Sequence, residues 1–275
     1  MSAFKPRFRF TYLLLFLFAI PSLSWAEDIS ALVAKRLSHD GKTLDLSGLK
    51  IGPSGAKQLA GMVSLAKVTT LYLQGNKIKY RGMKALAKSP HLAGLKHLDL
   101  WGNLLGDLGL KAISESPYLG QLESLKLWKN EISDDSMEFL VASKNLANLK
   151  TLMLNDNLIS PEGAEILASA KGFVQLVTLN LFRNEIGDEG ARAFANSKNF
   201  INLELLYLGQ NSITDQGAIA LIESQNFPQL KVLDLALNLL GEATTLAAFA
   251  HRTACRSRIA RMVRPASVRS QARSS

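Results

Sequence analysis

The chain has 275 residues, of which 47% are hydrophobic and 7% aromatic, so it has enough apolar material to bury the core of one or two domains. Its formal net charge is +9, but three basic residues precede residue 27 and seven arginines follow residue 250, and the 22 basic and 23 acidic residues between them leave the body at −1. This near-neutral body argues against nucleic acid as a partner, and the single cysteine, Cys255, excludes a disulfide framework.

Residues 1–26 have the layout of a cleaved secretory signal. Three basic residues precede an apolar run over residues 12–20, and Ser24 and Ala26 place small side chains before a cleavage point at Glu27. The run is shorter than the roughly 20 residues of a membrane-spanning helix, so an uncleaved anchor is the less favoured alternative. We expect an exported, periplasmic or secreted, bacterial protein without stable membrane insertion after signal cleavage.

Residues 27–40 are predicted to form a capping helix ahead of a repeat domain over residues 41–250. Four apolar residues fall on one face of this helix and would cover the first strand of the repeats. These residues are Ile29, Leu32, Val33 and Leu37.

The repeat domain has a fixed period of 27 residues. An asparagine recurs at this spacing without exception, and an eighth, earlier copy that begins at Leu44 has Leu49 in its place. The asparagines are Asn76, Asn103, Asn130, Asn157, Asn184, Asn211 and Asn238. Their amides can bond the backbone of their own turn and of the neighbouring one, so we expect a structural ladder rather than a catalytic use.

Each unit changes its hydrophobic period partway through. Strict alternation before the asparagine, as in Leu98 and Leu100, predicts a short strand, and apolar spacings of three and four residues after it predict a helix. Ser133, Ser160 and Thr214 stand at the expected N-cap positions of three of these helices. A single unit cannot bury its leucines alone, so the units must stack and share one interior.

The core L-x-x-L-x-L-x-x-N-x-I followed by G-A-x-x-L-A resembles leucine-rich repeats of the ribonuclease-inhibitor type, over about residues 41–250. The resemblance implies an α/β solenoid, a horseshoe of about eight 27-residue strand-turn-helix units. Its parallel sheet would line the concave face and its helices the convex face. Partners of such proteins usually bind on the inner face or its rim. More weakly, the repeats resemble those of bacterial host-interaction proteins.

Strand residues that point away from the core are the candidates for binding, because the repeat does not dictate their identity. Trp101 and Trp128 share one outward position on adjacent strands, which predicts rings about 5 Å apart. Exposed aromatic pairs usually anchor partners, although they can also merely pack on one another. The full predicted concave site comprises Tyr72, His97, Asp99, Trp101, Lys126, Trp128, Phe182 and Tyr207.

No catalytic motif accompanies these residues. His97, Asp99, Ser124 and Lys126 should lie together on the inner face, but none of the four histidines stands at a metal-ligand or nucleophile spacing. We therefore expect a monomeric protein that is not an enzyme and needs no metal or other cofactor.

The repeat pattern ends abruptly before the last 25 residues. Residues 251–275 hold seven arginines and no acid. Three interpretations remain open: a disordered basic tail, an amphipathic cap or surface helix, and the product of a reading-frame shift. The second would use Phe249, Ile259, Met262 and Val263.

Two hypotheses for function follow. The first is an exported binding protein that takes a protein, or a glycan, on its concave face. The second is a secreted effector that regulates a host protein such as a small GTPase, because similar repeats occur in GTPase activators.

Overall fold

The computed structural model describes residues 28–254, so the predicted signal over 1–26 and all but the start of the segment 251–275 lie outside the described residues. Eight strands form one parallel sheet in chain order. Each strand residue pairs with the residue 27 positions later on the next strand, as Leu71 does with Leu98. The strands are β1 (Thr43–Asp45), β2 (Thr70–Tyr72), β3 (His97–Asp99), β4 (Ser124–Lys126), β5 (Thr151–Met153), β6 (Thr178–Asn180), β7 (Leu205–Tyr207) and β8 (Val232–Asp234).

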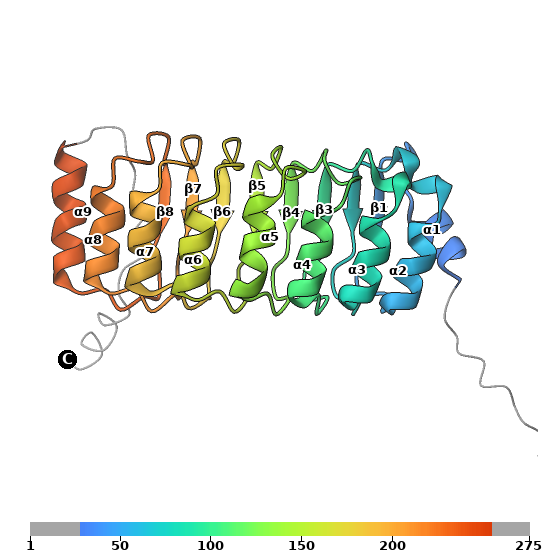
Figure 1. Ribbon diagram of the computed structural model, residues 1–275, viewed down its shortest axis with the longest axis horizontal. Helices are drawn as coiled ribbons and strands as arrows, with labels where there is room; N and C mark the ends of the chain where they lie inside the picture. Colours follow the sequence, from blue (N-terminus) through green and yellow to red (C-terminus); the bar gives the residue numbers. More distant parts are fainter. Residues whose placement is uncertain (1–27, 255–275) are drawn as a thin grey trace, which may run out of the picture.

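The helices form a second layer outside the sheet, with α1 before β1 and one further helix after each strand (Figure 1). Short 3₁₀ segments, Val63–Lys67, Pro90–Leu92 and Asp134–Ser136, complete some of the units. The helices are α1 (Ile29–Arg36), α2 (Gly52–Ala60), α3 (Lys79–Ala87), α4 (Gly106–Ser114), α5 (Met137–Ala142), α6 (Pro161–Ala168), α7 (Gly187–Asn196), α8 (Asp215–Glu223) and α9 (Glu242–Ala254).

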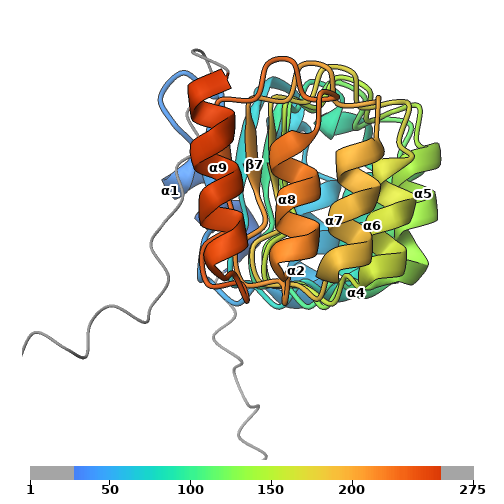
Figure 2. The same cartoon turned by 90° about the vertical axis from the view of Figure 1, so that its left-hand side faces the viewer.

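The solenoid is curved, with its helices on the outside. Viewed from the α9 end, the helices from α9 to α5 step outward to one side, and α1, which lies at the opposite end of the solenoid, projects on the same side as α9 (Figures 1 and 2). A row of helices is wider than a row of strands spaced about 4.8 Å apart, so stacking such units bends the sheet inward. The α/β leucine-rich-repeat solenoid predicted from the sequence, with its sheet on the concave face, is therefore confirmed.

The core is one continuous stack of leucine, isoleucine and phenylalanine between the two layers. The inward residue of every strand, from Leu44 to Leu233, is buried. Phenylalanine replaces leucine in the later units, at Phe173, Phe200 and Phe227, and these rings are buried as well. Because each unit shares its interior with its neighbours, the apolar contact of any one unit depends on the next.

The asparagine ladder forms as expected. The Asn157 amide Nδ2 donates to the carbonyl oxygens of Leu127 and Leu154, at 3.1 and 2.9 Å. Its Oδ1 accepts the backbone N–H groups of Asn130 and Ile132, at 3.0 and 3.1 Å. The side chain thus joins its own turn to the turn of the preceding unit, and it satisfies polar groups that would otherwise be buried without partners.

A second ladder at the start of the helices was not foreseen. Asp107 accepts both the backbone N–H and the hydroxyl of Ser133, at 2.8 Å each. Ser133 does stand at the N-cap position, ahead of the 3₁₀ segment Asp134–Ser136, but its side chain makes no cap hydrogen bond. Ser160 and Thr214 do cap their helices, and they also donate to aspartates of the preceding unit.

The last rung of this second ladder lies between α8 and α9. The Thr244 hydroxyl donates to the Asp215 carboxylate, which also accepts the backbone N–H of Gly241 at 2.8 Å. These bonds favour the charged carboxylate and lower the pKa of Asp215 below its ordinary value.

A pair of salt bridges links three units just before the start of their strands. The Glu123 carboxylate lies 2.8 Å from Lys150 Nζ and 3.0 Å from Lys96 Nζ. Hydrogen bonds from the two ammonium groups, of which that of Lys150 has the larger effect, lower the pKa of Glu123 to about 2. These bridges join the units of β3, β4 and β5 at the surface.

The two ends of the described solenoid differ. At the first, Asp28 caps α1 through the N–H of Ser30, and Ile29, Leu32 and Val33 are buried. At the other, Leu246 and Phe249 of α9 are exposed. None of the helices within residues 28–254 is long and apolar enough to cross a membrane.

Candidate binding site on the concave face

Two stacked tryptophans lie at the centre of the concave face. Trp101 and Trp128 stand two residues after the ends of β3 and β4, and their ring centroids are 5.1 Å apart at an interplanar angle of 27°. Each side chain remains 41% exposed. The backbone N–H of Trp101 donates to Asp99 Oδ1 at 3.2 Å, which fixes the turn at the end of β3. The predicted ring distance is confirmed, and the pair presents an apolar surface to solvent.

A small depression of about 100 Å³ lies on the strands β2, β3 and β4 beside this pair. Lys126 Nζ is 3.6 Å from Asp99 Oδ2, so the two charges offset each other across adjacent strands. Within residues 28–254, no hydrogen bond joins Ser124 to His97, so the cluster offers polar contacts rather than a nucleophile bonded to a base. The lining residues are Tyr72, His97, Leu98, Asp99, Ser124 and Lys126.

Phe182 and Tyr207 lie further along the sheet, apart from the tryptophan pair. Phe182 follows β6, and its ring covers Gly209, where an added Cβ would come within 2.7 Å of two ring atoms. Asn155 occupies the same column between Trp128 and Phe182, and it is buried with its Oδ1 unpaired. The eight predicted residues thus form a main group over β2–β4 and a separate aromatic pair over β6–β7.

A turn residue extends the main group beyond the strands. Trp128 Nε1 donates to Asp156 Oδ2 at 3.4 Å, and Asp156 Oδ1 lies 3.6 Å from Arg183 Nε. Both charged residues hold a left-handed backbone, with φ of 56° and 58°. Sequence reasoning missed them because they precede the ladder asparagines at a position that is glycine in earlier units, such as Gly75 and Gly102.

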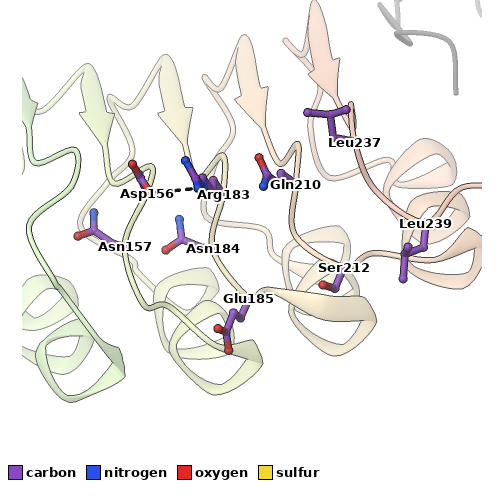
Figure 3. Close-up of a pocket in the computed structure, with 9 residues that line it drawn as sticks. All are labelled: Asp156, Asn157, Arg183, Asn184, Glu185, Gln210, Ser212, Leu237 and Leu239. Carbon is purple, nitrogen blue, oxygen red and sulfur yellow. Dashed lines mark ion pairs between the residues drawn. The ribbon is translucent and has the colours of Figure 1, made fainter. Parts of the chain in front are cut away.

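The same turns border a second depression, of about 320 Å³, on the rim (Figure 3). It is open and mostly polar, and the Asp156–Arg183 ion pair lies at its upper edge. Its lining residues are Asp156, Asn157, Arg183, Asn184, Glu185, Gln210, Ser212, Leu237 and Leu239. Within the described part of the chain, no group of three or more histidine, cysteine or acidic side chains is placed to hold a metal ion.

The solved structures that match this chain include the following three. An internalin (inlF) from Listeria monocytogenes is 17% identical over 77% of this chain and 70% of its own, with a TM-score of 0.38. The plant peptide hormone receptor RGFR1, solved with RGF2, is 20% identical over 64% of this chain, with a TM-score of 0.37. TLR13, solved with ssRNA13, is 23% identical over 79% of this chain, with a TM-score of 0.46. This chain covers 29% and 32% of the two receptors.

No curated protein matches the chain in sequence. The family model described as Leucine Rich repeat matches residues 64–87, 93–114, 176–195 and 201–221. These matches fall in units that the structure stacks in register, and each includes a strand and all or most of the helix that follows it. These four segments therefore match leucine-rich repeats, and the described part of the chain has the fold of a leucine-rich-repeat solenoid.

Proposed function

We propose that this chain is an exported binding protein that takes a protein partner on its concave face. The observation that carries the proposal is the stacked, exposed pair of Trp101 and Trp128 at the centre of that face. Burying a tryptophan side chain against a partner removes a large apolar area from water. It costs little conformational entropy, because the side chain has only two rotatable bonds. The repeat core does not need these rings, since the strand leucines on the opposite side are already buried.

The surroundings of the pair support the same function. Asp99 and Lys126 lie on one side, and Asp156 and Arg183 lie on the other, all within reach of a partner that covers the rings. An apolar centre with a polar border is the arrangement of a protein-binding surface, in which water is excluded from the centre. A glycan could stack on the same rings, and this remains the alternative ligand class.

Trp101→Ala and Trp128→Ala are each expected to weaken partner capture at least tenfold, which corresponds to about 1.4 kcal/mol or more. The melting temperature should stay near that of the parent, because both rings lie outside the core. Capture from an extract by the immobilised chain, before and after protease treatment of the extract, measures the effect and separates a protein from a glycan.

Ile201→Ala is the matched control, since it also removes an exposed apolar side chain but lies away from the concave strands. Fluorescence gives a second readout, because the pair supplies two of the three tryptophans, the other being Trp25. If the tryptophan variants bind as the parent does, or unfold early, the pair is packing material and the binding face lies elsewhere.

The finer parts of the proposal rest on the sequence. One strand and one helix in every 27-residue unit support the ribonuclease-inhibitor type of repeat. The basic opening, short apolar run and small residues before Glu27 support export from a bacterial cell. We expect exported protein to begin at Glu27. N-terminal sequencing of that protein tests this, and a chain that still begins at Met1 would rule out cleavage.

A further inference from the structure

The first part of the repeat domain is a block of positive charge. Residues 46–98 hold nine basic residues and no acid, whereas residues 121–250 hold nine basic and 16 acidic residues. The near-zero net charge of residues 27–250 therefore averages two regions of opposite sign. The basic residues of the block are Lys50, Lys57, Lys67, Lys77, Lys79, Arg81, Lys84, Lys88 and Lys96.

This charge is not neutralised within the protein. All nine side chains are exposed. Among the described residues, Lys96 is the one cation of the block that reaches an acid, with its Nζ 3.0 Å from Glu123. Arg81 instead donates to the Tyr80 hydroxyl at 3.1 Å. The block therefore presents a positive electrostatic potential that attracts an anionic partner.

A groove with an apolar floor lies between α3 and α4, at the border of this block. Its volume is about 350 Å³, and Ala87 and Ala112 are among the residues that line it. Leu108 of α4 is 59% exposed at its border, and Tyr80 of α3 is 37% exposed. Lys84 of α3, Lys88 just after it and Lys111 of α4 also line the groove. Glu115, the one acid among the lining residues, lies 3.8 Å from Lys111.

The lysines follow the repeat across the outer face of the helices. Lys57, Lys84 and Lys111 occupy the same position of α2, α3 and α4, and the next two units carry Glu138 and Glu165 there. These helices lie on the side of the solenoid opposite the sheet (Figure 1). A partner of the lysines would therefore leave the tryptophan pair accessible.

We propose that the outer surface of α2, α3 and α4 binds an anionic phospholipid membrane. A bilayer surface offers phosphate groups above an acyl layer, which matches lysine ammonium groups around exposed Leu108 and Tyr80. Lysine stems can lie along the apolar groove while their charged ends reach the headgroups, and tyrosine is favoured at this interface. A nucleic acid would use the charges but would leave the apolar side chains in water.

Co-sedimentation with vesicles tests the proposal with the full chain. The parent is expected to bind vesicles of phosphatidylglycerol and phosphatidylcholine in equal parts, and to bind pure phosphatidylcholine much more weakly. The triple variant Lys57→Gln, Lys84→Gln and Lys88→Gln should lose at least about tenfold in binding, because each lysine near an anionic surface contributes a several-fold gain.

The matched control removes three other exposed lysines with the same 27-residue spacing, namely Lys144, Lys171 and Lys198. It changes the net charge equally and leaves the arginines of 251–275 in place, so it should bind as the parent does. Leu108→Ser should also weaken binding, at unchanged charge. Equal losses of vesicle binding in both triple variants would overturn the proposal. So would a Leu108→Ser protein that binds vesicles as the parent does, if the parent also binds RNA as tightly as it binds vesicles. Either result would indicate a general attraction to polyanions. Unchanged melting temperatures confirm that every variant is folded.

Discussion

Replacing Asn157 by alanine is expected to lower the free energy of unfolding by about 2 to 4 kcal/mol. The change leaves the backbone N–H groups of Asn130 and Ile132 buried without their acceptor, and it removes the donor to the carbonyl groups of Leu127 and Leu154. Each buried polar group without a partner costs about 1 to 3 kcal/mol.

Urea denaturation followed by circular dichroism measures this loss. Asn196→Ala is the matched control, since it is the same substitution at an exposed position at the end of α7, and it should change stability by no more than about 0.5 kcal/mol. Equal shifts of the two midpoints would show that the ladder does not hold adjacent turns together.

Replacing Gly190 by valine is expected to destabilise the protein by about 3 kcal/mol, through overpacking between α6 and α7. A Cβ at Gly190 would lie 2.7 Å from Ala164 Cβ and 2.7 Å from Ile186 Cγ2. Ala164 Cβ is held by the backbone of α6, so the helices would have to separate. The loss would appear even though valine restricts the unfolded chain more than glycine does.

Gly94→Val provides the comparison, because the nearest atom to a Cβ at Gly94 is 3.9 Å away and the residue is exposed. Its effect should stay within about 0.5 kcal/mol. Thermal unfolding of both variants measures the difference. A Gly190→Val protein that melts with the parent would mean that α6 and α7 tolerate a wider spacing than their close contact indicates.

The sequence by itself determined the architecture and the centre of the candidate site. A constant 27-residue spacing forces equivalent residues onto adjacent strands, so the register, the asparagine ladder and the Trp101–Trp128 distance followed from counting alone. The alternation of leucines also settled which side chains point inward. These features depend on the backbone repeat and not on the particular neighbours of any side chain.

Only the tertiary structure decided which polar side chains meet across units and where grooves open. Ser133 binds Asp107, 26 residues away, and makes no cap bond, whereas Ser160 and Thr214 bind the equivalent aspartates and also cap their helices. Asp156 reaches Trp128 and Arg183 from a left-handed turn, and the glycines at this position of earlier units mark the turn but not these contacts. Such pairings are chosen by differences of an ångström between side chains on separate units, and a repeat sets the backbone spacing but leaves these side-chain positions open.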